Sequence, residues 1–247
     1  MGLKHVRETY EKLGAEDPLY AVLSFPDTQG NRWDPEAFFA RGRDEIGAAL
    51  EFIANLGLEP RRGRALDFGC GAGRLSQALC EEFDEVVGID ISSTMIETAE
   101  RFNRHGGRCR YIVNTNDRLP MLEDASFDFV YSNITLQHVP PEASARYVAE
   151  FIRVLKAGGV ALFQLPDGPY HSPGSLGERW YSFRRGPLRR GWKRVRGKPP
   201  VEIHYVNRRR VGEIVETAGG TVVDIRDDET ARRGRKSLFY TVAAPAP

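Results

Sequence analysis

One short stretch constrains the fold of this chain more than any other: an apolar segment, 64–68, followed at once by a loop with a glycine at every second position. The segment is typical of a β-strand with an acidic residue, Asp67, near its end, and the glycines are Gly69, Gly71 and Gly73. Glycine lets the backbone turn sharply and come close to a ligand. A helical pattern begins directly after the loop, and a helix N-terminus has free N–H donors and partial positive charge. This order of elements predicts a cradle for a nucleotide-like ligand.

Two kinds of ligand suit such a loop, and the spacing of its residues separates them. The dinucleotide fingerprint is G-x-G-x-x-G, in which the third glycine stands three places after the second. Here Arg74 holds that place, and the third glycine comes one residue early, at Gly73. Asp67 stands two residues before the first glycine, where a carboxylate repels a pyrophosphate but stabilises a cationic amino-acid group. An NAD-type dinucleotide is therefore the less favoured ligand.

A second acidic residue follows the next predicted strand. The run 85–90 is mostly apolar and ends in Asp90, 21 residues after Gly69. At this spacing, a carboxylate at the end of the second strand bonds ribose hydroxyls in nucleotide-binding α/β folds. Its two oxygens match the two donors of a ribose diol. Ile91 and Met95 stand where they would line an adenine ring. The pattern predicts a nucleoside in the same crevice.

The remaining pattern predicts an α/β fold. Strand and helix patterns alternate from residue 64 to residue 165, which favours a Rossmann-like, doubly wound parallel sheet with helices on both faces. Two closing strands separated by a charged loop predict a hairpin, so the last strand of the seven-stranded sheet should lie antiparallel. The predicted strands are 64–68, 86–90, 109–113, 127–132, 159–165, 221–226 and 236–243, and the predicted helices between them are 73–83, 93–105, 142–156 and 207–218.

Four regions are predicted along the chain. Residues 1–60 hold a short helix over 5–13 and a longer one that begins after Asp34 as N-cap, with Pro35 in the first turn, and we expect them to form a lid. The other regions are a cofactor-binding core (61–165), an arginine- and proline-rich insertion that would cap the substrate (166–205), and the C-terminal part of the core sheet (206–247).

Charge is distributed unevenly in the sequence. The stretch 179–198 holds nine Lys and Arg residues and no acidic residue, whereas the other 26 basic and 34 acidic residues leave the rest of the chain with a net charge of −8. A basic segment on an acidic body suits an anionic partner, or is a solvated surface loop. Aromatic residues lie among these arginines and could stack on nucleic-acid bases: Trp180, Tyr181, Phe183 and Trp192.

Several classes of protein and site are disfavoured by composition. Three cysteines without C-x-x-C spacing predict neither a disulfide framework nor structural zinc, and they suit a reducing cytoplasm. Five scattered histidines without H-x-x-x-H spacing predict no metal site. The first residues lack the apolar region of a secretory signal. No apolar run reaches the roughly 18 residues that a membrane span needs.

The D-x-G-x-G-x-G pattern at 67–73 resembles motif I of the class I S-adenosylmethionine-dependent methyltransferases. The stretch 127–140 resembles motif IV of the same family, and 155–160 resembles the family's glycine turn before the fifth strand. The resemblance extends over about residues 60 to 165. It implies S-adenosylmethionine as cofactor, S-adenosylhomocysteine as product, and the same seven-stranded sheet.

The family resemblance also implies roles for individual residues. Asp67 and the loop of Gly69, Cys70 and Gly71 would hold the methionine end, and Asp90 the ribose. The adenine amino group would bond an amide or carboxylate oxygen after the third strand, for which Asn114, Asn116 and Asp117 are the candidates. Ser132 and Asn133 would face the methionine part and the reactive methyl group.

His138, just past the fourth core strand, is the candidate general base, because a neutral imidazole can take a proton from an acceptor hydroxyl or amine. Helix capping and packing are the alternative roles for this histidine. His171 and His204 lie in the insertion and could face a substrate. The sequence thus predicts a methyltransferase acting at O or N of a small molecule, anionic or sugar-like if the arginines contact it. The alternatives are an RNA methyltransferase that uses the basic insertion, an NAD-dependent oxidoreductase, and a non-catalytic binding protein. The oligomeric state is not predicted.

Overall fold

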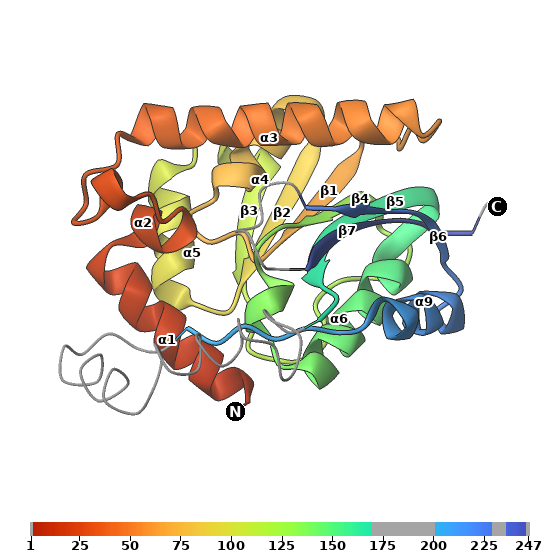
Figure 1. The fold of residues 1–247 in the computed structure, drawn as a ribbon. Helices are drawn as coiled ribbons and strands as arrows, with labels where there is room; N and C mark the ends of the chain where they lie inside the picture. Colours follow the sequence, from red (N-terminus) through yellow and green to blue (C-terminus); the bar gives the residue numbers. More distant parts are fainter. Residues whose placement is uncertain (1, 169–200, 229–235, 246–247) are drawn as a thin grey trace.

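The protein is described by a computed structural model over residues 2–168, 201–228 and 236–245. Its centre is a seven-stranded sheet with the strand order β3-β2-β1-β4-β5-β7-β6. β1 to β5 run parallel, and β7 pairs antiparallel with both β5 and β6 (Figure 1). The predicted fold class is confirmed. The strands are β1 (Arg64–Phe68), β2 (Glu85–Asp90), β3 (Cys109–Val113), β4 (Phe127–Ser132), β5 (Leu155–Pro166), β6 (Thr221–Asp227) and β7 (Ser237–Ala243).

Helices cover both faces of this sheet. Figure 1 shows α3 along one face, with α6 and α9 on the other. The helices are α1 (Leu3–Glu16), α2 (Pro18–Val22), α3 (Pro35–Asn55), α4 (Arg74–Glu82), α5 (Ser93–Phe102), α6 (Pro141–Val154) and α9 (Arg208–Thr217), and the 3-10 turns are η1 (Pro26–Thr28), η2 (Gly106–Arg108) and η3 (Leu136–His138).

Side chains alternate between two hydrophobic layers along the central strands, because successive residues of a strand point to opposite faces. Leu66 of β1 packs with α6 and α9, in a layer that includes Phe151 and Val211. Ala65 packs with α3 and α4, in a layer that includes Ile46 and Leu79. Burial of both faces explains why the core strands are nearly continuous apolar runs.

The start of α3 follows the predicted capping pattern. Asp34 accepts a hydrogen bond from the backbone N–H of Ala37 at 2.8 Å, and Pro35 occupies the first helical position. A side-chain oxygen at this position satisfies one of the free donors of the first turn. Local sequence thus specifies where this long helix begins.

Two predicted helix ends are wrong by a few residues. The helix predicted over 142–156 ends at Val154, because Leu155 is already extended and pairs with Phe127, and Lys156 reaches the Asp128 carboxylate at 2.7 Å. The helix predicted over 93–105 ends at Phe102, where Asn103 donates to the carbonyls of Gly106 and Cys109. In both cases side-chain and strand contacts after the helix outcompete another helical turn.

Within the described ranges, no helix combines the length and apolar character needed to cross a membrane. Most of the predicted insertion lies outside them, including the arginines of 179–198, His171 and the aromatic residues Trp180, Tyr181, Phe183 and Trp192. The described parts of the insertion are 166–168, which begins with the last residue of β5, and 201–205, which has no helix or strand and precedes α9.

Candidate active site

A cavity lies at the carboxyl ends of β1, β2 and β4, where open α/β sheets bind ligands. Side chains of α1 and α2 close it from the other side, among them Leu3, Val6, Tyr10 and Val22. Residues of the N-terminal segment therefore line this cavity, and its role as a lid stays a prediction. The predicted site residues that line the cavity are Gly69, Gly71, Asp90, Ile91, Met95, Asn114, Asn133 and His138.

The glycine loop needs glycine for its own packing. Gly69 has a φ of 80°, and a Cβ there would lie 2.1 Å from the Thr135 hydroxyl oxygen. Gly71 has a φ of 52°, and a Cβ there would lie 2.7 Å from a methyl carbon of Val22. Both positions combine a left-handed backbone with close neighbours, which only glycine tolerates. The sharp turn predicted from the sequence is present.

The first three N–H groups of this loop point to β2 and not to a ligand. Gly69 and Cys70 both donate to the carbonyl of Ile89, at 2.7 and 3.0 Å, and Gly71 donates to Asp90 at 2.9 Å. The expectation that these donors meet the ligand is wrong, since the end of β2 already uses them. A pyrophosphate needs free N–H donors at such a loop, so this geometry disfavours a dinucleotide.

Asp90 ends β2 at the cavity wall. One carboxylate oxygen accepts from Gly71 N–H and the other from Ser92 N–H, each at 2.9 Å. Burial raises the pKa of this carboxyl group, although the hydrogen bonds from Ser92 and Gly71 oppose the shift. Each carboxylate oxygen has a further lone pair. Asp90 can therefore accept from two ribose hydroxyls, with Ile91 and Met95 beside it on the cavity wall.

Asp67 lies behind the loop and not on the cavity wall. Its side chain is 1% exposed, and one oxygen accepts from the Ser76 hydroxyl at 2.6 Å. The other oxygen has no hydrogen-bond partner among the described residues. Burial raises the pKa of Asp67 to about 7, against the opposing contact with Ser76. A buried acceptor without a donor is costly, so this oxygen is a candidate contact for a cationic group.

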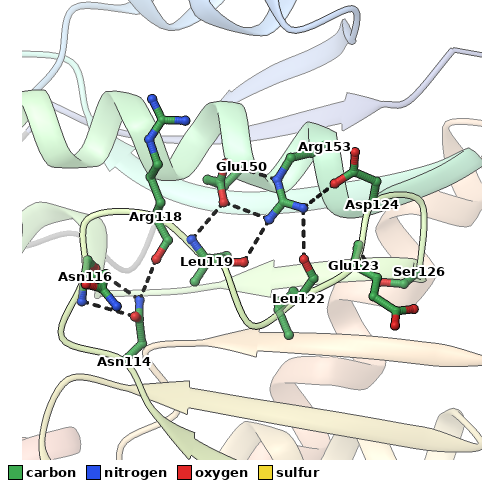
Figure 2. Close-up of polar contacts among 10 residues, drawn as sticks. All are labelled: Asn114, Asn116, Arg118, Leu119, Leu122, Glu123, Asp124, Ser126, Glu150 and Arg153. Atoms are coloured by element: carbon green, nitrogen blue, oxygen red, sulfur yellow. Dashed lines mark hydrogen bonds and ion pairs between the residues drawn. The ribbon is translucent and has the colours of Figure 1, made fainter.

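The candidates for the adenine contact separate in the structure. Asn114 lines the cavity, but its amide shapes the loop after β3: it donates to the carbonyls of Asn116 and Arg118 and accepts from Asn116 N–H (Figure 2). The Asn116 side chain is exposed. Asp117 pairs with Arg146 at 2.8 Å on the surface. Neither Asn116 nor Asp117 is among the residues that line the cavity.

A network on α6 that the sequence did not suggest holds this same loop. Arg153 donates to the carbonyls of Leu119 and Leu122, both at 2.9 Å, and pairs with Glu150 and Asp124 (Figure 2). Glu150 in turn accepts from the N–H of Leu119 at 2.8 Å. The network ties residues 114–126 to α6 and so fixes the wall that carries Asn114.

The end of β4 carries two predicted residues with different environments. The buried Ser132 hydroxyl donates to the carbonyl of Phe68 at 2.9 Å and ties β4 to β1, so it is not among the residues on the cavity wall. Asn133 does line the cavity, and its amide nitrogen donates to Glu45 of α3 at 2.7 Å. Glu45 was not predicted, because nothing in the local sequence of α3 marks it.

His138 lies on the cavity wall within η3. Its Nδ1 is 2.9 Å from the backbone carbonyl of Glu202, and its Nε2 is 3.1 Å from the amide nitrogen of Gln137. A carbonyl only accepts, so we assign the ring proton to Nδ1, which leaves Nε2 as the acceptor. For His204, which the sequence predicted to lie near a substrate, the backbone N–H donates to the carbonyl of Gln137. The segment 201–205 thus holds the imidazole of His138 in place through the carbonyl of Glu202.

Glu11 fastens α1 over the cavity. Its carboxylate accepts from the N–H groups of Ser93 and Thr94 at the start of α5, at 2.9 and 3.1 Å, and from the hydroxyls of Ser92 and Ser93. Burial acts to raise the pKa of Glu11, but these hydrogen bonds outweigh it and lower the pKa to about 2. A carboxylate at a helix N-terminus is stabilised by the helix dipole as well. The sequence around Glu11 does not indicate this contact.

Across the described ranges, no group of His, Cys, Asp and Glu side chains is arranged to hold a metal ion. The three cysteines are buried and unpaired. The polar side chains on the cavity wall are those of Tyr10, Asp90, Asn114, Asn133, Thr135, His138 and Tyr147, with apolar side chains between them.

Comparisons with known proteins agree with this geometry. Residues 65–159 match a family model described as a methyltransferase domain. A ubiquinone biosynthesis O-methyltransferase of Hahella chejuensis is 33% identical over 146 residues, and one of Methylococcus capsulatus is 33% identical over 133 residues. The alignments include 59% and 53% of this chain, which spans only 60% and 54% of the lengths of these relatives.

Two solved structures share the fold over most of their length. The magnesium protoporphyrin IX methyltransferase of Synechocystis PCC 6803, solved with bound SAM, has a TM-score of 0.62 at 15% identity, with 98% of this chain and 96% of that chain covered. A SAM-dependent methyltransferase of Leishmania major has a TM-score of 0.63 at 15% identity, with coverages of 95% and 81%. At such identities the likeness establishes the fold.

Proposed function

Because residues 65–159 are a methyltransferase domain within the class I fold, we propose that this protein is an S-adenosylmethionine-dependent methyltransferase that acts on a hydroxyl oxygen of a small molecule. The observation that carries the proposal is the state of the glycine loop. Its first three N–H groups, those of Gly69, Cys70 and Gly71, are bonded to Ile89 and Asp90, so the crevice suits a nucleoside with a cationic tail better than a pyrophosphate. The names of the curated relatives support oxygen as the acceptor atom.

The residues present fit S-adenosylmethionine. Asp90 offers acceptors for the ribose hydroxyls, and Ile91 and Met95 offer an apolar surface for the adenine. The unpartnered oxygen of Asp67 supports a cationic amino-acid end near the loop, since an opposite charge stabilises a buried carboxylate. When bound, this cofactor supplies a methyl group that is already activated by the positive charge on sulfur.

The protein has two tasks in such a reaction: to align the acceptor and to remove its proton. His138 suits the second task, because the Glu202 carbonyl keeps the ring proton on Nδ1 and leaves Nε2 as the basic atom. For Nε2 to take the proton from the hydroxyl of the methyl acceptor, the Gln137 amide nitrogen must first leave its position 3.1 Å from Nε2.

Many of the side chains that line the cavity are apolar, among them Leu3, Val6, Ala21, Val22, Ile134 and Val139. They support an acceptor whose reacting end is apolar or aromatic. The anionic or sugar-like character of the acceptor, and the RNA alternative, both depend on the arginines of 179–198, which lie outside the described residues. The anionic character stays a prediction, and no observation on the described residues favours RNA. The three unpaired cysteines support a cytoplasmic location.

The test is a methyl-transfer screen. The protein is incubated with S-adenosylmethionine and a panel of phenols, aliphatic alcohols and amines, and S-adenosylhomocysteine and methylated products are measured by mass spectrometry. We expect turnover with one class of hydroxyl acceptor and a loss of about 10²- to 10⁴-fold for His138→Gln, the usual contribution of a general base. Binding of NAD without binding of S-adenosylhomocysteine would contradict the proposal.

A further inference from the structure

Glu45, on α3, connects the glycine loop to the end of β4. One carboxylate oxygen accepts from the Asn133 amide at 2.7 Å and from the Tyr131 hydroxyl at 3.1 Å. The other pairs with Arg74, the residue after the glycine loop, at 2.8 Å. The Arg74 side chain is 4% exposed and that of Glu45 26%. Hydrogen bonds that involve charged groups are stronger than neutral ones, so this arrangement is well fixed.

The contact with Glu45 determines which way the Asn133 amide points. An ionised carboxylate only accepts, so the NH₂ group of Asn133 must face Glu45. The amide oxygen then lies on the opposite branch of a side chain that lines the cavity, and it has no hydrogen-bond partner among the described residues. Asn133 therefore presents an acceptor to the cavity.

The charges around this point favour a cation. Asp67 and Glu45 are acidic and Arg74 is basic, and the carboxylate of Asp67 has one oxygen without a partner in the described structure. β1 and β4 pair directly, with Asp67 opposite Tyr131, so the buried Asp67 lies behind the strand end that carries Asn133. With Asp67 ionised, one further positive group would balance the charges of these side chains.

On the basis of the proposed function, we infer that Glu45 is a positioning residue for the methionine end of the cofactor, which orients the Asn133 amide oxygen to accept a hydrogen bond from the ammonium group. Glu45 lies outside the matched domain 65–159. Its task is separate from holding α3 in place, because Ile46, Leu50 and Ile53 already bury the face of α3 beside it.

The test compares two ligands that differ at the methionine end. S-adenosylhomocysteine has the amino-acid part, and 5′-methylthioadenosine lacks it. Both are titrated by calorimetry into the wild type, Glu45→Ala, Asn133→Ala and the double variant. We expect each single variant to bind S-adenosylhomocysteine about tenfold more weakly than the wild type does. The double variant should also lose about tenfold, because both substitutions remove the same contact. The affinity of every variant for 5′-methylthioadenosine should stay within about twofold of the wild type.

Arg43→Ala is the matched control. It removes the other ion pair between α3 and α4, from Arg43 to Glu81 at 3.9 Å, without touching Asn133, so both ligands should bind as to the wild type. Asn133→Ala leaves the Glu45–Arg74 pair intact and tests the inference even if Glu45→Ala unfolds, which thermal melting would reveal.

Three results would overturn the inference: equal weakening of both ligands, unchanged affinity for S-adenosylhomocysteine, or additive effects in the double variant. A wild type that binds neither ligand would instead contradict the proposed function, and this inference with it.

Discussion

At the residue scale, the two strand-end carboxylates differ in their surroundings although the sequence presents them alike. Asp90 lines the cavity and accepts from two backbone N–H groups. Asp67 is 1% exposed, lies behind the loop and has one oxygen without a partner in the described part of the chain. The first is suited to neutral hydroxyl donors, and the second to a positive charge.

Replacement of Asp90 by alanine should weaken the binding of S-adenosylhomocysteine by about 1–3 kcal/mol, the scale of lost hydrogen bonds to a charged group. Calorimetric titration measures this change. Glu97→Ala, on the exposed side of α5, is the control and should bind as the wild type does. If Asp90→Ala bound S-adenosylhomocysteine as tightly as the wild type does, the assignment of Asp90 to the ribose hydroxyls would be wrong.

Asp67 predicts a dependence of stability on pH. Its pKa rises from 3.8 to about 7 on folding, so the folded state holds the proton more tightly, and stability falls as the pH rises from about 4 to about 7. Asparagine does not titrate. As the pH rises from 5 to 8, the free energy of unfolding of Asp67→Asn, measured with urea, should therefore increase by about 2 kcal/mol relative to that of the wild type.

The same Asp67→Asn variant should bind S-adenosylhomocysteine more weakly at pH 8, because the amide cannot balance a positive charge. A constant difference in stability between variant and wild type from pH 5 to pH 8 would show that Asp67 is not a buried carboxyl with a raised pKa.

At the element scale, the site depends on contacts between segments far apart in the chain. Glu11 of α1 bonds the start of α5, and Arg153 of α6 bonds the loop after β3. Both contacts replace free backbone groups with charge-assisted hydrogen bonds. They hold α1 and the loop after β3 in place beside the cavity.

Glu11→Gln should loosen α1. Its pKa of about 2 in the folded state, against 4.5 ordinarily, means that the ionised carboxylate stabilises the docked helix above about pH 4.5 and that this stabilisation is lost as the pH falls towards 2. At pH 7 we expect the docking of α1 to weaken by about 1–3 kcal/mol, seen as faster amide hydrogen exchange within α1.

Glu8→Gln on the exposed side of α1 is the control for this measurement and should leave exchange unchanged. Equal exchange in the wild type and Glu11→Gln at pH 7 would show that the carboxylate does not fasten the helix.

Arg153→Ala should destabilise the protein by about 2–4 kcal/mol, because it removes the charged partner of the largely buried Glu150 and the guanidinium donor to two loop carbonyls. Arg146→Ala, on the same helix, removes only the surface pair with Asp117 and should cost less than about 1 kcal/mol. Urea unfolding compares the two variants, and similar losses would contradict the role given to the network.

Local patterns explain which elements the sequence could predict. The glycine loop, the Asp34 cap and the alternation of strands and helices depend on neighbouring residues, and the sheet and its antiparallel last strand follow from them. The end of α6 could not be placed, because pairing of Leu155 with β4 decides it. Glu11, Glu45 and Arg153 could not be identified either, since their partners lie far away along the chain or in loops whose shape no pattern specifies.

At the scale of the whole molecule, residues 65–159, which match the methyltransferase-domain model, supply the strand-end side of the cavity, and segments outside them supply the rest. α1 and α2 close the cavity, α3 holds Asn133 through Glu45, and the segment 201–205 fixes His138. A site assembled in this way retains a common cofactor geometry while the surrounding segments determine the acceptor.

The most direct measurement is a crystal structure of the protein soaked with saturating S-adenosylhomocysteine. The account predicts that the ribose hydroxyls contact Asp90 and that the amino-acid end lies beside Asp67 and the Asn133 amide oxygen. An empty crevice under these conditions, or a pyrophosphate-bearing nucleotide bound there in its place, would contradict it.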